Sequence, residues 1–201
     1  MSKNNIAEIK EFFLRDTKNH KVEILNDNGN NRTLCCSNNG SCYYKFYITT
    51  WNGYLCVSGD IGVWVFSRLP DMFEFFRGKE NPDFHYWSEK LEGGTSNSHS
   101  LAECWDADLF IDQLTQMINE RDYDPEETER LLELARNEIF PKTSYEAEAV
   151  LAIFDCDEIN EKVFGSYYEH DLGKQYHHRF VWVCFAIVWA IKEYDKIRGA
   201  A

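Results

Sequence analysis

Residues 43–76 constrain the fold more than any other part of this 201-residue chain. They begin with alternating aromatic, β-branched and polar residues, which is typical of a half-buried strand. Asn52 and Gly53 follow, and both tolerate the positive φ angles of a two-residue type I′ hairpin turn. Gly59 and Gly62 frame a second reversal before residues 63–67. The segment therefore predicts a three-stranded antiparallel meander.

The third strand of this meander is apolar on both sides. Val63 and Val65 would point to one face of the sheet, and Trp64 and Phe66 to the other. A strand with two apolar faces is typical of a sheet that is covered on both sides. Pro70 then suits the first turn of a helix, which would end before residue 78.

A longer motif runs through the same segment, T-W-N-G-Y-L-x-x-x-G-D-x-G-x-x-x-F-x-R-x-x-D-M-F-x-F-F, with N-P-x-x-x-x-W-x-E-K at residues 81–90. This motif resembles a family of small phage- and prophage-encoded proteins of uncharacterised function, over residues 20–90. This chain has Asn52 where members of the family carry proline. The resemblance implies a viral origin and a bacterial host cytoplasm, and it transfers no catalytic residue.

The remaining chain predicts an α+β fold. Apolar spacing indicates an N-terminal helix over residues 4–15, and strands over residues 20–25 and 32–36 extend the antiparallel meander to about five strands. After residue 98 the chain indicates only helices, over residues 100–120, 124–140, 147–154, 158–164 and 173–197. We expect a single α+β domain over residues 1–201, with a neutral β-rich region (1–92) and an acidic helical region (98–201).

The net charge of −13 is distributed unevenly. Residues 1–90 carry 11 acidic and 11 basic side chains, whereas residues 91–201 carry 23 and 10. Such an acidic region disfavours direct binding to nucleic acid but could face a basic cleft of a protein that binds it. The alternative is a solvated face that only keeps the protein soluble. The carboxylates predicted to form this partner-binding surface are Asp106, Asp108, Asp112, Glu120, Asp122, Asp124, Glu126, Glu127 and Glu129.

A second hypothesis uses aromatic and arginine side chains of the β-rich region. They could form a pocket that stacks on a nucleotide or cyclic-nucleotide signal and binds its phosphate, although an ordinary sheet-on-helix core explains the same residues. Asp60, between two glycines, could be a general base or could cap its own turn. The candidate ligand-binding residues are Trp51, Tyr54, Asp60, Trp64, Arg68 and Arg32.

A third hypothesis is a metal-dependent enzyme. His170, His177 and His178 form the densest group of potential ligands, and imidazole suits Zn²⁺ or Mn²⁺. Gly173 argues against one continuous helix there, and an exposed polar cap before a buried helix is the alternative. Since no catalytic motif stands out, the sequence favours a binding protein over an enzyme, and we expect no cofactor.

The resemblance implies a phage-encoded protein, and with the one-sided acidity and the lack of a catalytic motif we expect a non-enzymatic binding protein that inhibits a host protein, such as a component of antiviral defence. The partner would be a host bacterial protein, for example a defence protein that binds nucleic acid. The first ten residues lack a secretory signal, and the longest apolar run, residues 180–191, is shorter than the roughly 20 residues that span a bilayer. We therefore expect a cytoplasmic protein without membrane contact. Aromatic residues of the last helix could serve a homodimer as well as a monomer core.

Overall fold

The computed structural model describes residues 3–79, 81–94, 101–165 and 171–199, with side chains from residue 6 onwards. The chain forms two compact units. The first, here the sheet unit, comprises residues 1–103 and 176–201. The second, here the helical unit, comprises residues 104–175 and is therefore an insertion in the sheet unit.

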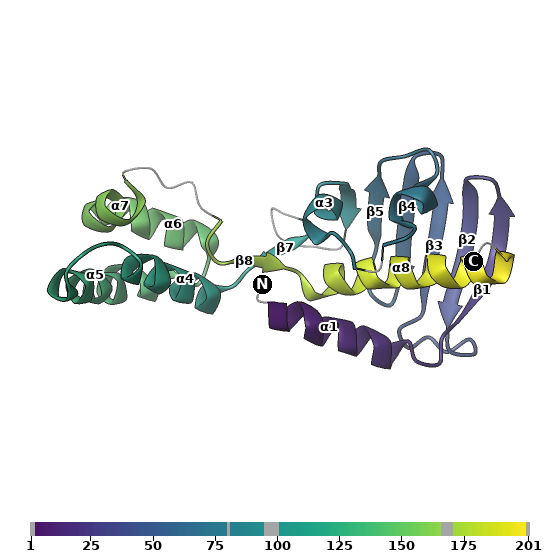
Figure 1. Ribbon diagram of the computed structural model, residues 1–201, viewed down its shortest axis with the longest axis horizontal. Coiled ribbons are helices and arrows are strands. Elements are labelled where there is room, and N and C mark those ends of the chain that lie inside the picture. Colours follow the sequence, from purple (N-terminus) through teal and green to yellow (C-terminus); the bar gives the residue numbers. More distant parts are fainter. Residues whose placement is uncertain (1–2, 80, 95–100, 166–170, 200–201) are drawn as a thin grey trace. The chain divides into compact units, whose positions relative to one another are not determined.

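The sheet unit contains a six-stranded antiparallel sheet in which every strand pairs with its neighbours in sequence (Figure 1). The predicted meander and α+β class are confirmed, and the sheet has one strand more than the five expected. That strand, β6, includes Gly93, which lies in a stretch rich in glycine. The strands are β1 (Lys21–Asn28), β2 (Asn31–Ser37), β3 (Phe46–Trp51), β4 (Tyr54–Gly59), β5 (Trp64–Ser67) and β6 (Leu91–Gly94).

The turn between β3 and β4 differs from the predicted type. Trp51 pairs with Tyr54, so the turn has two central residues, as expected. Gly53 has a φ of +83°, but Asn52 is not among the residues with positive φ. A type I′ turn needs positive φ at both positions, so the turn belongs to another class and glycine alone supplies the unusual dihedral.

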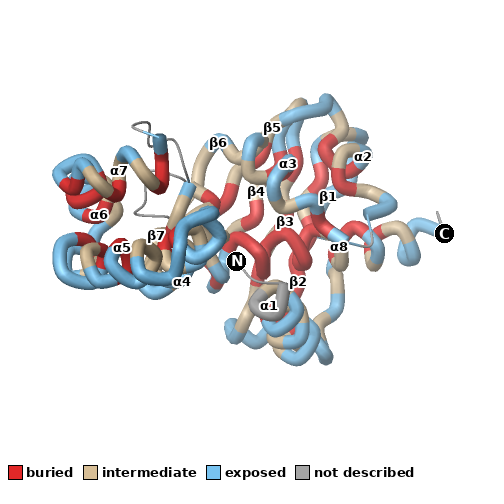
Figure 2. Tube along the Cα trace, turned by 60° about the vertical axis from the view of Figure 1, so that its left-hand side comes forward, coloured by how far each residue is buried: buried red, intermediate tan, exposed pale blue. Residues whose placement is uncertain are grey.

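Four helices pack on one face of this sheet: α1 (Lys3–Asp16), α2 (Met72–Phe76), α3 (Phe84–Ser88) and α8 (His178–Arg198). The longest, α8, has 21 residues and runs alongside α1 across the sheet (Figure 1). Its central residues 180–187 are all buried (Figure 2). Trp182 meets the ring of Phe13 edge-on at 5.1 Å between centroids and that of Phe46 at 5.6 Å. The core of the sheet unit thus lies between α8 and the sheet.

The opposite face of the sheet has no such cover from the helices of the sheet unit, as far as the described residues extend. Trp64 and Phe66 are fully buried, whereas Val63 is 47% exposed and Val65 is half-buried. The expected cover on both sides of the sheet is therefore not found among the described residues of the sheet unit. The small size and β-branching of the two valines suit a half-exposed strand face.

The helical unit has a core of its own. Helices α4 (Ala107–Asn119), α5 (Pro125–Glu138), α6 (Glu146–Asp155) and α7 (Asp157–Phe164), with the 3₁₀ turn η1 (Phe140–Lys142), bury apolar side chains against one another. Phe110, Leu114, Leu131 and Ile153 are among those fully buried. The chain enters the unit through β7 (Glu103–Trp105) and leaves it through β8 (Lys174–Tyr176), and these two strands pair.

The predicted boundaries were wrong at both ends of this unit. In place of the helix expected from residue 100, the chain forms β7 and then α4, whose N-cap is Asp106. The predicted cap residue Ser100 lies outside the described residues. The expected helix from residue 173 is β8 followed by α8. Because α8 is apolar on all sides, it needs burial on the sheet, so it belongs to the sheet unit and not to an acidic helical half.

No helix in the described parts of the chain combines the length and apolarity needed to cross a membrane. The aromatic residues of α8 pack into the core of the sheet unit of a single chain, where Phe180, Trp182, Phe185 and Tyr194 are buried and Trp189 is half-buried.

Candidate functional site

The charge of the protein divides along the boundary between the two units. The helical unit carries 19 of the 34 acidic side chains and six of the 21 basic ones, so it holds the whole net charge of −13. The sheet unit carries 15 of each and is neutral. The same net charge lies in a shorter segment than residues 91–201, because residues 91–103 and the C-terminal helix with its lysines belong to the sheet unit.

Three of the nine predicted carboxylates have structural roles in the helical unit. Asp106 accepts a hydrogen bond from the Leu109 amide at 3.0 Å and so caps α4. Asp124 accepts one from the Glu127 amide at 2.9 Å and caps α5. Glu127 itself lies in an ion-pair cluster described below. These contacts use the carboxylates to stabilise the helices.

The other six are exposed. Glu120 accepts a hydrogen bond from the side-chain amide of Gln116, at 2.6 Å, and Glu129 pairs with Arg136 at 2.8 Å. The remaining four carboxylates form no ion pair with any described residue. They are therefore the carboxylates best placed to act on a partner. These four, here the acidic quartet, are Asp108, Asp112, Asp122 and Glu126.

The ion-pair cluster joins α5 to α7. Arg130 Nε lies 2.9 Å from a carboxylate oxygen of Glu127, and its Nη1 lies 2.8 Å from one of Glu158. Lys162 contacts both carboxylates. Hydrogen bonds from Arg130, and then from Lys162, lower the pKa of Glu127 and of Glu158 to about 2. This cluster is neutral and stabilising, so it is not part of the acidic surface.

Helix α6 has an exposed apolar stripe that the sequence analysis missed. Its buried residues are Ala149, Ala152 and Ile153, whereas Leu151 and Phe154 are 60% and 46% exposed. With exposed Ala147 they form an i, i+4, i+7 stripe, here the α6 stripe. The sequence signal was present, because this helix has more apolar positions than one buried face needs.

An acidic pocket of about 290 Å³ adjoins this helix, since Ala152 and Asp155 of α6 line it. Its other charged residues are Glu138, Asp157, Glu158 and Lys142. Because Glu158 is already paired with Arg130 and Lys162, three carboxylates remain against the one ammonium group of Lys142. The pocket suits a basic side chain.

The sheet does not present the predicted aromatic–arginine surface. Trp51 and Tyr54 are 39% and 38% exposed, and their rings stack at 5.3 Å with an interplanar angle of 15°. The Arg68 amide donates a hydrogen bond to the Gly53 carbonyl at 3.3 Å, so Arg68 lies at the same end of the sheet as the turn between Trp51 and Tyr54. These three residues are brought near one another.

The other three predicted ligand residues are elsewhere. The Trp64 ring is fully buried beneath α8, 6.1 Å from Phe180. Asp60 lies in the turn between β4 and β5 and accepts a hydrogen bond from the Tyr44 amide at 3.0 Å, so it binds the backbone of the segment before β3 and does not cap its own turn with this contact. Arg32 is 9% exposed and already paired with carboxylates. The prediction of one pocket from these six residues is wrong, because alternation along β5 turns Trp64 into the core.

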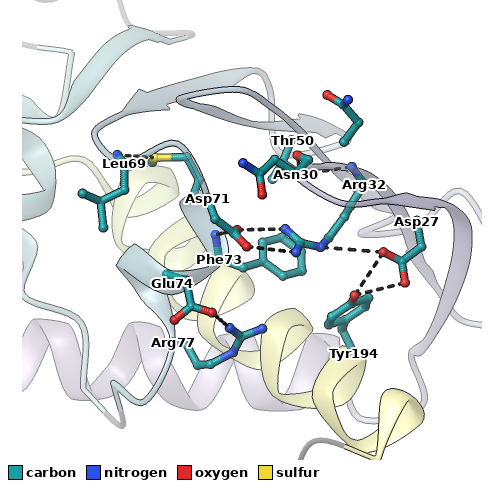
Figure 3. Close-up of polar contacts among 12 residues, drawn as sticks. Asp27, Asn30, Arg32, Thr50, Leu69, Asp71, Phe73, Glu74, Arg77 and Tyr194 are labelled. Atoms are coloured by element: carbon teal, nitrogen blue, oxygen red, sulfur yellow. Dashed lines mark hydrogen bonds and ion pairs between the residues drawn. The ribbon is translucent and has the colours of Figure 1, made fainter.

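Arg32 instead joins three elements of the sheet unit (Figure 3). Its Nη1 and Nη2 donate to the two oxygens of Asp71 at 2.8 and 2.9 Å, and its guanidinium stacks over Phe73. Tyr194 of α8 donates to Asp27 of β1 at 3.1 Å. Burial raises the pKa of Asp71, but hydrogen bonds from Arg32 and the Phe73 amide outweigh it and leave the pKa below its ordinary value.

The histidines do not form a metal site in the described residues. His170 lies outside those residues. His177 is the N-cap of α8, and its Nδ1 accepts a hydrogen bond from the Arg179 amide at 3.1 Å. Burial and the charge of Arg179 lower the pKa of His177. His178 opens α8, 6.2 Å from the ring of Phe12. Across the described residues, no three His, Cys, Asp or Glu side chains are grouped to hold a metal ion.

A basic groove of about 660 Å³ lies in the sheet unit, lined by α1, the end of α2 and the last turns of α8. Phe76, Val188 and Ile191 give it an apolar part, and Asp195 is the carboxylate in its lining. The groove could not be predicted from the sequence because its cations come from three separate segments. Those cations are Lys10, Arg77, Lys79, Lys192 and Lys196.

We compared the chain with protein-family models, with curated proteins and with solved structures, and none matched.

Proposed function

We propose that this protein is a phage-encoded, non-enzymatic binding protein that inhibits a basic host protein through its helical unit. The observation that carries the proposal is the confinement of the whole net charge of −13 to that unit, beside a neutral sheet unit. A charge needed only for solubility has no reason to be confined to one unit. An acidic unit with its own core is instead suited to bind a positively charged partner.

The acidic quartet would act mainly on association. Its exposed, unpaired carboxylates attract a positively charged surface over a distance of about 10 Å at moderate salt. This attraction speeds the encounter and orients the partner before contact. A basic cleft that normally binds nucleic acid has the matching potential, and its occupation by the helical unit would exclude the nucleic acid.

The α6 stripe would form the centre of the contact. Interfaces commonly combine an apolar centre with a polar rim. Leu151 and Phe154 supply the apolar centre, and Glu148 and Asp155 on the same helix supply acidic neighbours. The adjacent pocket of about 290 Å³ would receive a lysine or arginine of the partner.

The test is capture of partners from bacterial lysate by the tagged protein, at low and high salt, with quantitative mass spectrometry. Two fourfold variants are compared with the wild type, and each loses four negative charges. One removes the acidic quartet (D108N, D112N, D122N, E126Q), and the other removes exposed carboxylates of the sheet unit (E8Q, E11Q, E23Q, E92Q).

The proposal predicts a basic protein that is retained by the wild type and by the sheet-unit variant, is lost from the acidic-quartet variant, and is released by high salt. Equal loss from both variants would show that only total charge matters. Retention by the acidic-quartet variant would show that the helical unit is not the binding surface.

A further inference from the structure

The cations of the basic groove are only partly neutralised by the carboxylates around them. Arg77 Nε and Nη2 donate to the two oxygens of Asp195 at 2.9 and 3.0 Å, and Arg77 also pairs with Glu74. Lys196 pairs with Glu193 at 2.5 Å. Arg77 and Lys196 are therefore neutralised, and Asp195, the carboxylate in the lining, is already paired.

Three lysines of the groove have no carboxylate partner among the described residues. Lys10 Nζ lies 3.3 Å from the side-chain oxygen of Asn81 and 5.7 Å from the ring of Phe185. Lys79 and Lys192 are exposed. Ammonium groups gathered on one groove repel one another, so an anion that enters it is attracted by all three. This arrangement favours a ligand with at least two negative charges.

The attraction of helix ends for cations does not explain the whole set. The last turn of α8 carries Lys196 and Arg198, which suit the negative end of the helix dipole. Lys10 lies in the middle of α1, and Lys192 lies more than a turn before the end of α8. Their position on one groove therefore requires another reason.

The apolar part of the groove defines the rest of the ligand. Phe76 and Ile191 are buried in the wall, and Val188 is half-buried. A volume of about 660 Å³ is in the range of small-molecule sites, which typically combine an apolar lining with a few polar groups. A bare inorganic anion would leave the apolar wall unused.

From this combination we infer that the basic groove binds a small organic phosphate, with its phosphates on Lys10, Lys79 and Lys192 and an apolar or planar body, such as a nucleobase, on the apolar wall at Val188. A nucleotide has this chemistry. The site lies wholly within the sheet unit, so it is independent of the proposed partner surface on the helical unit.

The experiment is isothermal titration calorimetry on the full chain with a nucleoside diphosphate, the matching uncharged nucleoside and inorganic phosphate. Two double variants with the same loss of charge are compared: K79Q/K192Q in the groove and K18Q/K21Q on exposed lysines elsewhere in the sheet unit. Circular dichroism shows whether each variant is folded.

We expect the diphosphate to bind, and the nucleoside and inorganic phosphate to bind at least tenfold more weakly. The K79Q/K192Q variant should weaken binding of the diphosphate at least tenfold, and K18Q/K21Q should leave it within twofold. The inference is overturned by an absence of diphosphate binding, by inorganic phosphate that binds equally well, or by equal losses in the two variants.

Discussion

The guanidinium of Arg32 and the carboxylate of Asp71 form two parallel hydrogen bonds, 2.8 and 2.9 Å long, between residues 39 positions apart. Asp71 also accepts the Phe73 amide at 2.9 Å and caps α2. The Asp71 carboxylate thus binds the start of helix α2 to the start of strand β2. The network continues through Asp27 to Tyr194 of α8 (Figure 3).

Asp71→Ala is expected to destabilise the sheet unit strongly. It removes a helix cap and leaves the guanidinium of Arg32, which is 9% exposed, without its bidentate partner. Losing a helix cap and the charged hydrogen-bond partner of a part-buried guanidinium together costs about 3 kcal/mol of unfolding free energy. Urea denaturation of the wild type and of the variant measures this loss of unfolding free energy. The matched control is Glu193→Gln, which breaks the exposed pair with Lys196 and should cost less than about 1 kcal/mol. Similar costs for both variants would contradict this role of Arg32.

The same pair predicts a loss of stability in acid. The pKa of Asp71 in the folded protein lies below its usual value near 3.8. The carboxylate therefore contributes its full stabilisation above that value, and the contribution is lost as the pH falls further, through the folded-state pKa. Denaturation of the wild type and of D71A across this window should show their difference in unfolding free energy shrink with falling pH. A difference that stays constant down to pH values well below the usual pKa would contradict the expectation.

Arg130→Gln is expected to raise the pKa of two glutamates in the helical unit. Hydrogen bonds from Arg130 are the main cause of the pKa of about 2 for Glu127 and Glu158, whose ordinary value is 4.5. Carboxyl chemical shifts followed by NMR should show both titrations move toward 4.5 in the variant. Because Lys162 remains, the pKa values should stay somewhat below 4.5. Unchanged titrations would show that the cluster does not form in solution.

Alanine substitutions at two glycines of the helical unit distinguish the cost of backbone strain from the cost of a steric clash. Gly173 and Gly165 have φ of +71° and +69°, so alanine meets similar backbone strain at either position, about 1 kcal/mol. An added Cβ at Gly173 would lie 2.5 Å from the Trp105 ring and 2.8 Å from Phe110, whereas nothing lies within 4 Å at Gly165. Thermal denaturation should therefore show a larger loss for G173A than for G165A. Equal losses would contradict the packing of Gly173 against Trp105.

Leu151→Ser tests the α6 stripe. Leu151 is 60% exposed, so the change should alter the unfolding free energy by no more than about 0.5 kcal/mol. It should nevertheless reduce the amount of host partner retained in the capture experiment. Leu14→Ser is the control, because Leu14 is 53% exposed on α1 of the sheet unit. Retention that falls equally for both variants, or for neither, would remove the α6 stripe from the proposed interface.

The sheet was largely predictable from the sequence because its signals are local. Glycine turns and alternating strands define β3 to β5, and Asp124 with Pro125 defines the start of α5. The division into units was not predictable in the same way. The pattern of α8 shows that it must be buried, but the sequence pattern does not show which partner buries it.

The candidate sites were harder to predict for the same reason. Strand alternation already placed Trp64 and Phe66 on a common face, but only the packing of α8 shows that this face is the core. Lys10, Lys79 and Lys192 are separated by most of the chain, so no spacing joins them into a groove. The acidity of the helical unit was visible because it is a property of one continuous segment.

The measurement that tests the central claim most directly is the dissociation constant of the captured partner as a function of salt, for the wild type and both fourfold variants. An acidic binding surface on the helical unit predicts steep weakening with salt for the wild type and for the sheet-unit variant. The acidic-quartet variant should bind more weakly at low salt and depend less on salt. An identical salt dependence for all three proteins would contradict the account.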